Sequence, residues 1–336
     1  MALKLFGRGA EVDGDEPSLL PDGSMPELLR SGSVPEPPPA KPPTAPRTLP
    51  TERPLFVFSA VLTILSVLSL TFGLTLSVIG TVRHARDQQT AFDDLRATLA
   101  NAITPVTQTD EAGNLLPLGT ALAVIDIPQI SLREVIFEGT NSGVLRSGPG
   151  HRRDTPMPGQ AGTSVLMGRQ AGYGGPFRAI GELVPGNTFN VTTGQGEQQG
   201  RHIFRVIAVR RAGDLQPPPV AAGKGRITLI TAAGIPWVPA GLLRVDADLV
   251  GPTEPNGPRV LDLRSLPQPE RPMQGDPSAW IFVLLLSQLL FGAAIAVTWA
   301  RYRWGVWQAW LSGGPVLLAV GVAITDQAAK LLPNLM

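Results

Sequence analysis

Few side chains in this chain could carry chemistry near neutral pH. The chain has 336 residues, no cysteine and three histidines, His84, His151 and His202. The absence of cysteine excludes disulfides, thiolate metal sites and thiol catalysis together. The residues that flank the histidines do not match the spacing of metal ligands. The sequence therefore predicts neither a metal site nor a cofactor.

The stretch ITLITAAG at residues 227–234 is typical of a strand that enters a barrel core. Branched apolar residues alternate with threonine, which is the pattern of a β-strand. The strand ends at Ala232, Ala233 and Gly234, where the side chains become small. Because neighbours on a strand point to opposite faces, Thr231 and Ala232 are expected on different sides of the sheet.

The composition indicates a membrane protein with one soluble domain. Only 16% of the residues are charged, the net charge is +1, and the apolar residues gather in three long runs. A nucleic-acid-binding protein would need a basic stripe, and none is visible. The expected partners are the lipid bilayer and a protein of the membrane or envelope, and no nucleic acid.

The N-terminal part of the chain contains a tail, a span and a connector. Residues 1–54 hold twelve prolines and few large apolar residues, and they predict a disordered tail. The alternative is a docking site for a domain that binds proline-rich segments. Residues 55–82 predict a transmembrane helix that serves as an uncleaved signal anchor. Residues 83–104 have apolar side chains at helical spacing and predict an amphipathic connector helix, which Pro105 ends.

The remainder of the chain divides into a β domain and a helical hairpin. Residues 105–250 contain short alternating apolar segments separated by Gly, Pro and Asn, which predict an all-β barrel or sandwich. Residues 251–278 hold seven prolines and predict a linker. The apolar runs 279–300 and 305–325 predict two more transmembrane helices, followed by a C-terminal tail at 326–336. Small residues and a proline interrupt the last run, so a re-entrant or interfacial helix is the alternative.

The short loop 301–304 decides the expected orientation. Arginines and lysines balance on the two sides of the first apolar run, whereas Arg301 and Arg303 lie in the hairpin loop. The positive-inside rule places this loop in the cytoplasm. With three spans, the protein is expected in the cell membrane as a multi-pass protein. Its N-terminus is cytoplasmic and its β domain is extracytoplasmic.

An ordered set of motifs lies between residues 88 and 250. They are AVIDIPQISLREVIFEGT (123–140), LRSGPGH (145–151), TPMPGQAGTSVLMGR (155–169), YGGPFRAIGELVPGNTFNVTT (173–193), ITLITA (227–232) and LLRVDADL (242–249). As a set they resemble the sortase family, most closely its class E members. The resemblance implies a mainly β fold, a closed sortase-like β-barrel with short helices, anchored here by about three transmembrane helices.

The resemblance also implies a chemistry and a departure from it. Sortases cut a sorting signal in a secreted protein and join the product to an amine through a cysteine thioester. A histidine serves in acid–base chemistry, and an arginine stabilises the oxyanion. The matched motifs put Ala232 at the cysteine, Arg169 at the histidine and Arg244 at the arginine. Alanine has no nucleophilic atom and arginine stays protonated, so we expect a degenerate pseudoenzyme site without catalytic residues.

Other residues that could do chemistry have simpler structural explanations. Thr231 is expected as a β-former in the barrel wall, and Ser164 in mid-strand as a packing residue. His151 belongs to the GPGH segment and is expected as a turn residue rather than a general base. His202 begins a strand and is expected at the surface.

The expected function is that of a membrane-anchored, extracytoplasmic sortase-like protein. It has lost transpeptidase activity and acts as a binding or assembly module in the cell envelope. Arg169 and Arg244 are its ligand-binding candidates, for an anion or carboxylate, unless they are unrelated surface charges. Two other functions stay open. One is an active transpeptidase or amide hydrolase with a non-cysteine nucleophile such as Thr231. The other is a structural subunit of a membrane complex, which the small residues Gly313 and Gly314 would support.

The predicted orientation can be tested with a reporter that is active only outside the cytoplasm. A fusion at Gly223 is expected to be active and a fusion in the 301–304 loop silent, because Arg301 and Arg303 hold that loop inside. The measurement is reporter activity in intact cells. The opposite pattern would overturn the orientation.

Overall fold

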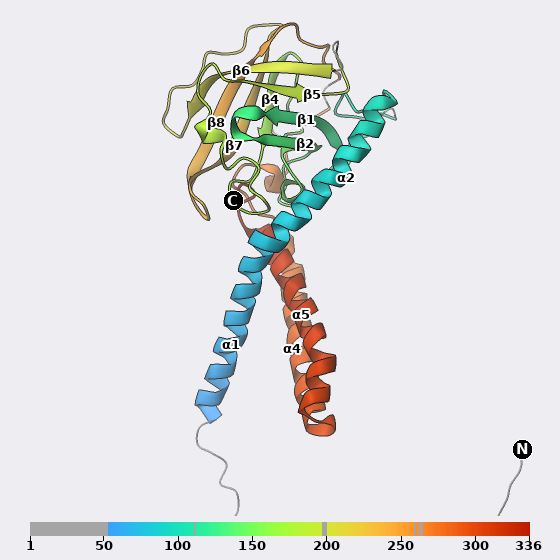
Figure 1. Ribbon diagram of the computed structural model, residues 1–336, viewed down its shortest axis with the longest axis vertical. Coiled ribbons are helices and arrows are strands. Elements are labelled where there is room, and N and C mark those ends of the chain that lie inside the picture. The colour runs from blue at the N-terminus through green and yellow to red at the C-terminus, as the bar shows by residue number, and fades with distance from the viewer. Residues whose placement is uncertain (1–52, 111, 197–199, 259, 262–264) are drawn as a thin grey trace, which may run out of the picture. The chain divides into compact units, whose positions relative to one another are not determined.

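The computed structural model describes residues 53–336 except 111, 197–199, 259 and 262–264. Residues 1–52 of the predicted proline-rich tail lie outside the described residues. The described part contains a closed β-barrel and three helical stretches that are long and apolar enough to cross a membrane (Figure 1). The predicted fold class is confirmed.

Eight strands within the described residues form the barrel. They are β1 (Ala121–Ile127), β2 (Leu132–Glu138), β3 (Gly150–His151), β4 (Gly162–Met167), β5 (Thr188–Thr192), β6 (Arg201–Arg210), β7 (Gly225–Ile235) and β8 (Val238–Val250). Their order around the barrel is β1-β2-β3-β4-β7-β8-β6-β5, and pairing of β1 with β5 closes it. The pairs β2–β3 and β4–β7 are parallel, and the others are antiparallel.

The barrel interior is filled by apolar side chains that alternate along the strands. Ile125 and Ile127 of β1 are fully buried there, and the rings of Phe189 and Phe204 stack with their centroids 5.7 Å apart. Strand β7 differs, because it is buried continuously over residues 225–233. A continuous buried run means that both faces of the strand are covered.

One helical stretch precedes the barrel in the chain and packs against its outside. Helix α1 (Arg53–Leu74) passes through a π-helical turn (Thr75–Ile79) into α2 (Gly80–Ala100) without a break. A Cβ at Gly80 would lie 2.9 Å from the ring of Tyr173, so glycine permits this close contact between helix and barrel loop. The predicted span and connector are therefore parts of one continuous helical stretch.

The end of α2 corrects the predicted end at Pro105. The Asn101 side chain donates to the carbonyl oxygen of Ala97 over 2.8 Å. Ala102 then adopts a φ of 55°, which lies in the left-handed region and stops a right-handed helix. The helix ends before the proline because these two residues already turn the chain.

Helix α2 is fastened to β2 by apolar packing and by one glutamine. Leu95 is buried in a cluster with Val135 and Phe137. The Gln88 amide donates to the Ser147 carbonyl over 2.8 Å, and its oxygen accepts from the Val135 amide over 2.7 Å. This face of α2 is therefore part of the β domain and not only a connector.

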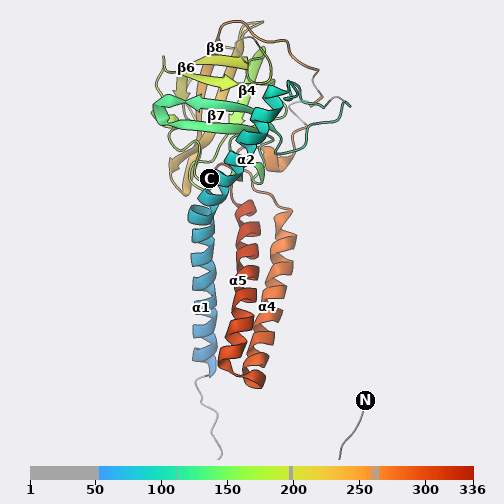
Figure 2. The ribbon, with the colours of Figure 1, turned by 45° about the vertical axis from the view of Figure 1, so that its right-hand side comes forward.

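The C-terminal helices form a hairpin of α4 (Ala279–Trp304) and α5 (Val306–Leu331), which Figure 2 shows side by side. The predicted third span ended at residue 325, but α5 continues to Leu331. Asp326 accepts from Arg83 over 2.8 Å and from Arg146 over 2.7 Å. The predicted span ended before Asp326 because a carboxylate interrupts the apolar run, but these two ion pairs compensate its charge. The predicted tail at 326–336 therefore begins too early.

The predicted linker at residues 251–278 is packed on the barrel. Glu270 is only 2% exposed and accepts hydrogen bonds from Arg153, with the Nε–Oε2 distance 2.9 Å. Leu266 is also buried. Prolines shape this segment, but its buried side chains hold it against the β domain.

Candidate functional site

The two faces of β7 have different surroundings near its end. Ile230 and Ala232 belong to an apolar cluster on the outside of the barrel, whereas Leu229 and Ala233 belong to the barrel core. The alternation follows from the period of two in a strand. Ala232 is 1% exposed, so the position matched to a nucleophile is dry and covered.

Residue Thr231 faces away from this outer cluster. Its hydroxyl donates to the carbonyl oxygen of Gly168 over 2.8 Å and is 1% exposed. It therefore ties β7 to the end of β4, as expected for a residue of the barrel wall.

Arg169 follows β4 and is buried with its charge. It is 1% exposed, and its guanidinium carbon lies 4.9 Å from the ring centroid of Tyr173. Its Nη2 donates to the Ser142 carbonyl over 3.2 Å. Burial, together with the positive charge of Arg146 and against the effect of Tyr173, lowers the pKa of Arg169 to about 10. The side chain stays charged at neutral pH and cannot accept a proton there.

A segment more distant in sequence covers this site. Leu335 is fully buried in the same apolar cluster as Ala232. The Gln170 amide donates to the Leu335 carbonyl over 2.9 Å, and Arg169 Nη1 donates to the Met336 carbonyl over 3.1 Å. Ala232, matched to the catalytic nucleophile, therefore shares a cluster with Leu335. Arg169, matched to the base, forms a hydrogen bond with Met336 of the same chain.

Asn334 anchors this segment in the protein. Its side-chain amide donates to the carbonyls of Thr140 over 2.8 Å and Arg271 over 3.0 Å, and its backbone amide donates to Gln274 over 3.0 Å. Asn334 is fully buried. Sequence reasoning missed Asn334 and Leu335, and the one signal for them is the mainly apolar run LPNLM at residues 332–336, directly after the last helix.

Arg244 lies on β8, opposite Ile230 of β7 and Arg210 of β6. It is half-buried. Burial and the nearby charge of Arg210 lower the pKa of Arg244, and Asp246 opposes them. Within the described residues no contact joins Arg244 to Arg169, and the charge beside Arg169 is that of Arg146. Pairing across the sheet sets Arg244 in one row with Ile230 and Met167, and Met167 precedes Arg169 by two residues.

Comparison with known proteins identifies the barrel. Residues 125–237 match the family model of the sortase domain. "Sortase D" of Bacillus subtilis (strain 168) is 33% identical over 93 residues, and the match covers 26% of this chain and 46% of that protein. The matched stretch thus spans about half of this curated relative. The barrel is a sortase domain.

Solved structures include sortases similar to this chain. The Clostridium perfringens Sortase D5 transpeptidase has 19% sequence identity and a TM-score of 0.39, with 49% of this chain and 99% of that chain covered. Sortase E1 of Streptomyces coelicolor with a tripeptide in the active site has 21% identity and a TM-score of 0.33. That match covers 40% of this chain and 90% of that chain.

The histidines of this sortase domain are buried in polar networks. His151 is fully buried, and its Nδ1 lies 2.9 Å from Glu138 and its Nε2 3.0 Å from the Pro156 carbonyl. Burial lowers the pKa of His151, but Glu138 outweighs burial and the pKa is raised above its ordinary value of 6.5. Both ring nitrogens face oxygen acceptors, so this imidazole donates on both sides and is not a free base.

His202 corrects an expectation. It was expected at the surface but is only 6% exposed, with its Nε2 3.0 Å from the Gln195 carbonyl and 3.1 Å from the Thr193 hydroxyl. Ser164 is 1% exposed, as expected for a packing residue. In the described part of the chain, no group of three or more His, Asp or Glu could hold a metal ion.

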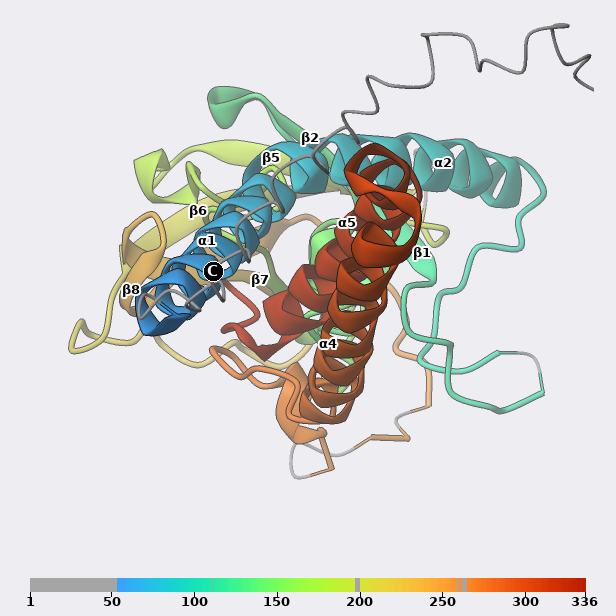
Figure 3. The same ribbon diagram turned by 90° about the horizontal axis from the view of Figure 1, so that it is seen from below.

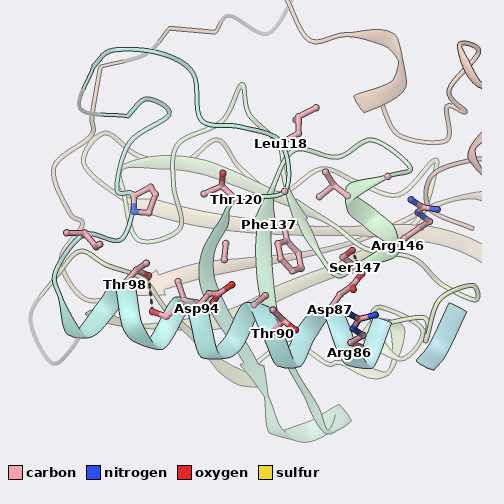
Figure 4. A pocket seen from close by; sticks show the side chains of 18 residues that line it. Arg86, Asp87, Thr90, Asp94, Thr98, Leu118, Thr120, Phe137, Arg146 and Ser147 are labelled. Atoms are coloured by element: carbon pink, nitrogen blue, oxygen red, sulfur yellow. Dashed lines mark hydrogen bonds between the residues drawn. The ribbon is translucent and has the colours of Figure 1, made fainter. Parts of the chain in front are cut away.

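A pocket of about 910 Å³ lies elsewhere on the sortase domain, between α2 and the strands β1 and β2 (Figure 4). Asp87, Asp94 and Arg86 line it, and Asp87 accepts from the Ser147 hydroxyl over 2.7 Å. Its lining includes Arg146, but neither Arg169 nor Ala232. Its lining carries hydroxyls such as that of Ser147 but no histidine and no cysteine, so it gives no reason to place the chemistry of a sortase there.

The His151–Glu138 pair predicts a pH dependence of stability. Because the folded state raises the pKa of His151, it keeps a proton that the unfolded chain releases above pH 6.5. The stabilisation is complete below pH 6.5 and is lost as pH rises through the raised pKa. Thermal unfolding of the full chain in detergent, followed by β-sheet circular dichroism, is expected at a lower temperature as pH rises. His151→Gln should flatten that dependence, and an identical slope in both proteins would contradict this account.

Replacement of Arg169 tests the energetic cost of its buried charge. Within the described residues its hydrogen bonds go to main-chain oxygens and to no acidic side chain, and desolvation of a charge without an acidic side-chain partner is unfavourable. Arg169→Met should leave the free energy of unfolding unchanged or raise it by about 2 kcal/mol. Arg244→Met is the half-buried control and should change it by less than about 0.5 kcal/mol. A loss above about 1 kcal/mol in Arg169→Met would show that the two hydrogen bonds outweigh desolvation.

Proposed function

We propose that this chain is a membrane-anchored, extracytoplasmic sortase-like protein without transpeptidase activity, which serves as a binding or assembly module in the cell envelope. The observation that carries the proposal is the occupation of the outer face of β7, where Leu335 shares a cluster with Ala232. Acyl transfer needs a nucleophile, a proton carrier and a charge stabiliser within hydrogen-bond reach.

The matched residues supply neither the nucleophile nor the proton carrier. Ala232 has no nucleophilic atom, and Arg169 with a pKa of about 10 stays charged at neutral pH. Arg244 has the charge of an oxyanion stabiliser but lies next to Arg210 on the adjacent strand. What the site retains is the means to hold a peptide, since an apolar cluster accepts a side chain while Gln170 and Arg169 donate to two carbonyls.

An active enzyme with an unusual nucleophile is the second candidate. Thr231 is the residue it would need, but its hydroxyl donates to Gly168 on the face away from Ala232. The third candidate is a structural subunit of a membrane complex. Gly313 has contacts with Val297 so close that a Cβ would overlap it, so this small residue serves the α4–α5 hairpin within the chain. Crosslinks confined to the spans would favour this third candidate.

Cysteine scanning of β7 tests the proposal in a chain that has no native cysteine. In Ala232→Cys, the thiol should react slowly with a maleimide, because Leu335 covers it. Adding Leu335→Asp puts a charge into the apolar cluster and should displace the segment, so that labelling rises on the order of tenfold or more. Ala233→Cys is the matched control, because its side chain faces the barrel core and should remain unlabelled in both backgrounds.

Activity of the natural protein would decide against the proposal. No cleavage or transpeptidation of a sorting-signal peptide is expected from the unmodified chain. Ala232→Cys with Arg169→His restores the matched residue types and should label faster than Ala232→Cys alone with a thiol-reactive peptide. Turnover by the unmodified chain that disappears in Thr231→Val would instead establish the rival enzyme.

A further inference from the structure

The turn between β7 and β8 exposes an apolar tip. Ile235 is 68% exposed, Trp237 38% and Val238 60%. Between Arg226 and Arg244 the sequence contains no charged residue. Single exposed apolar residues are ordinary on a soluble protein, but a contiguous exposed group at a hairpin tip usually marks a binding surface.

The backbone of this tip is also unusual. Pro236 and Trp237 form the turn, and Trp237 adopts a φ of 70°, a region where glycine is favoured over large side chains. Such backbone strain, held at a large exposed side chain, points to a use for that side chain. Pro236 and Pro239 carry no N–H, and Ile235 pairs with Val238 across the turn, so few unpaired donors remain there.

The tip lies beside a helix that is suited to lipid. Trp237 lines a pocket of about 390 Å³ together with Leu70, Gly73 and Leu74 of α1. Leu70 is 66% and Leu74 46% exposed, and α1 belongs to a helical stretch apolar enough to cross a membrane. Figure 3 shows the β7–β8 hairpin next to α1. The apolar surface of the tip is therefore continuous with the lipid-facing surface of this helix.

We propose that residues 235–238 insert into the membrane surface beside α1, so that the barrel contacts lipid directly as well as through its helices. Tryptophan favours the headgroup region because its ring is apolar while its N–H still finds a polar partner. The lack of charge around the tip removes the main cost of insertion, and the prolines reduce the cost of placing backbone there. This proposal needs a bilayer around α1, and it does not depend on the proposed function of the site at Ala232.

Single cysteines at the two ends of β8 test this inference in the full chain. Val238→Cys and Val250→Cys replace valines that are 60% and 44% exposed, about 40 Å apart along the strand. Each is labelled with an environment-sensitive fluorophore and reconstituted into phosphatidylcholine vesicles that contain acyl-chain nitroxide lipids. The label at 238 should be quenched about twofold or more, since interfacial segments enter ~5–10 Å, and the label at 250 should not.

A second variant and a second quencher separate the possible occupants of the tip. Trp237→Gly relaxes the turn, because glycine favours positive φ, and removes the ring, so it should reduce lipid quenching at 238. Equal quenching at both ends of β8 would overturn the proposal. So would protection of the label at 238 from both nitroxide lipid and aqueous iodide, since a protein surface, such as a second copy, would then cover the tip.

Discussion

The double burial of β7 is the constraint on which this structure depends. One face of the strand fills the barrel core through Leu229 and Ala233, and the other builds a second apolar cluster through Ile230 and Ala232. A group that approaches Ala232 must therefore be apolar, and its backbone must find partners, because unpaired polar groups in a dry region are costly. Leu335 meets both conditions, since its side chain is fully buried and its carbonyl accepts from Gln170.

Arg169 brings a charge into the same dry region. Two backbone carbonyls and the ring of Tyr173 surround its guanidinium, which offsets part of the cost of burial. Tyr173 is itself held with a φ of 53°, and its amide donates to the Leu76 carbonyl over 3.1 Å. A contiguous set of contacts therefore runs from Arg169 through Tyr173 to the π-helical turn that follows α1.

The membrane helices and the β domain share further contacts. Asp326 of α5 accepts from Arg83 of α2 and from Arg146 beside the barrel, and Trp237 lies against α1. Two spans, α4 and α5, separate the barrel from the segment after α5, which puts both on the same side of a membrane. The contacts of Asn334 with Thr140 and Arg271 are consistent with that arrangement. The domain is thus held close to its helices by ion pairs, hydrogen bonds and apolar packing.

Local patterns in the sequence predicted a β domain, as a barrel or a sandwich, three apolar helices and the opposite faces of Thr231 and Ala232, because alternation and hydropathy are properties of neighbouring residues. The closed barrel was implied by the resemblance to sortases. The sequence also shows directly that residue 232 carries no thiol. Tertiary structure alone decided that Leu335 covers Ala232, that the Arg169 charge is buried beside Tyr173, and that His202 is buried. Tertiary contacts also explain why α5 continues beyond Asp326, because Arg83 and Arg146, which are distant in sequence, compensate its charge. A local pattern shows which face of an element is apolar, but the residues that cover the face come from elsewhere in the chain, and only folding brings them there.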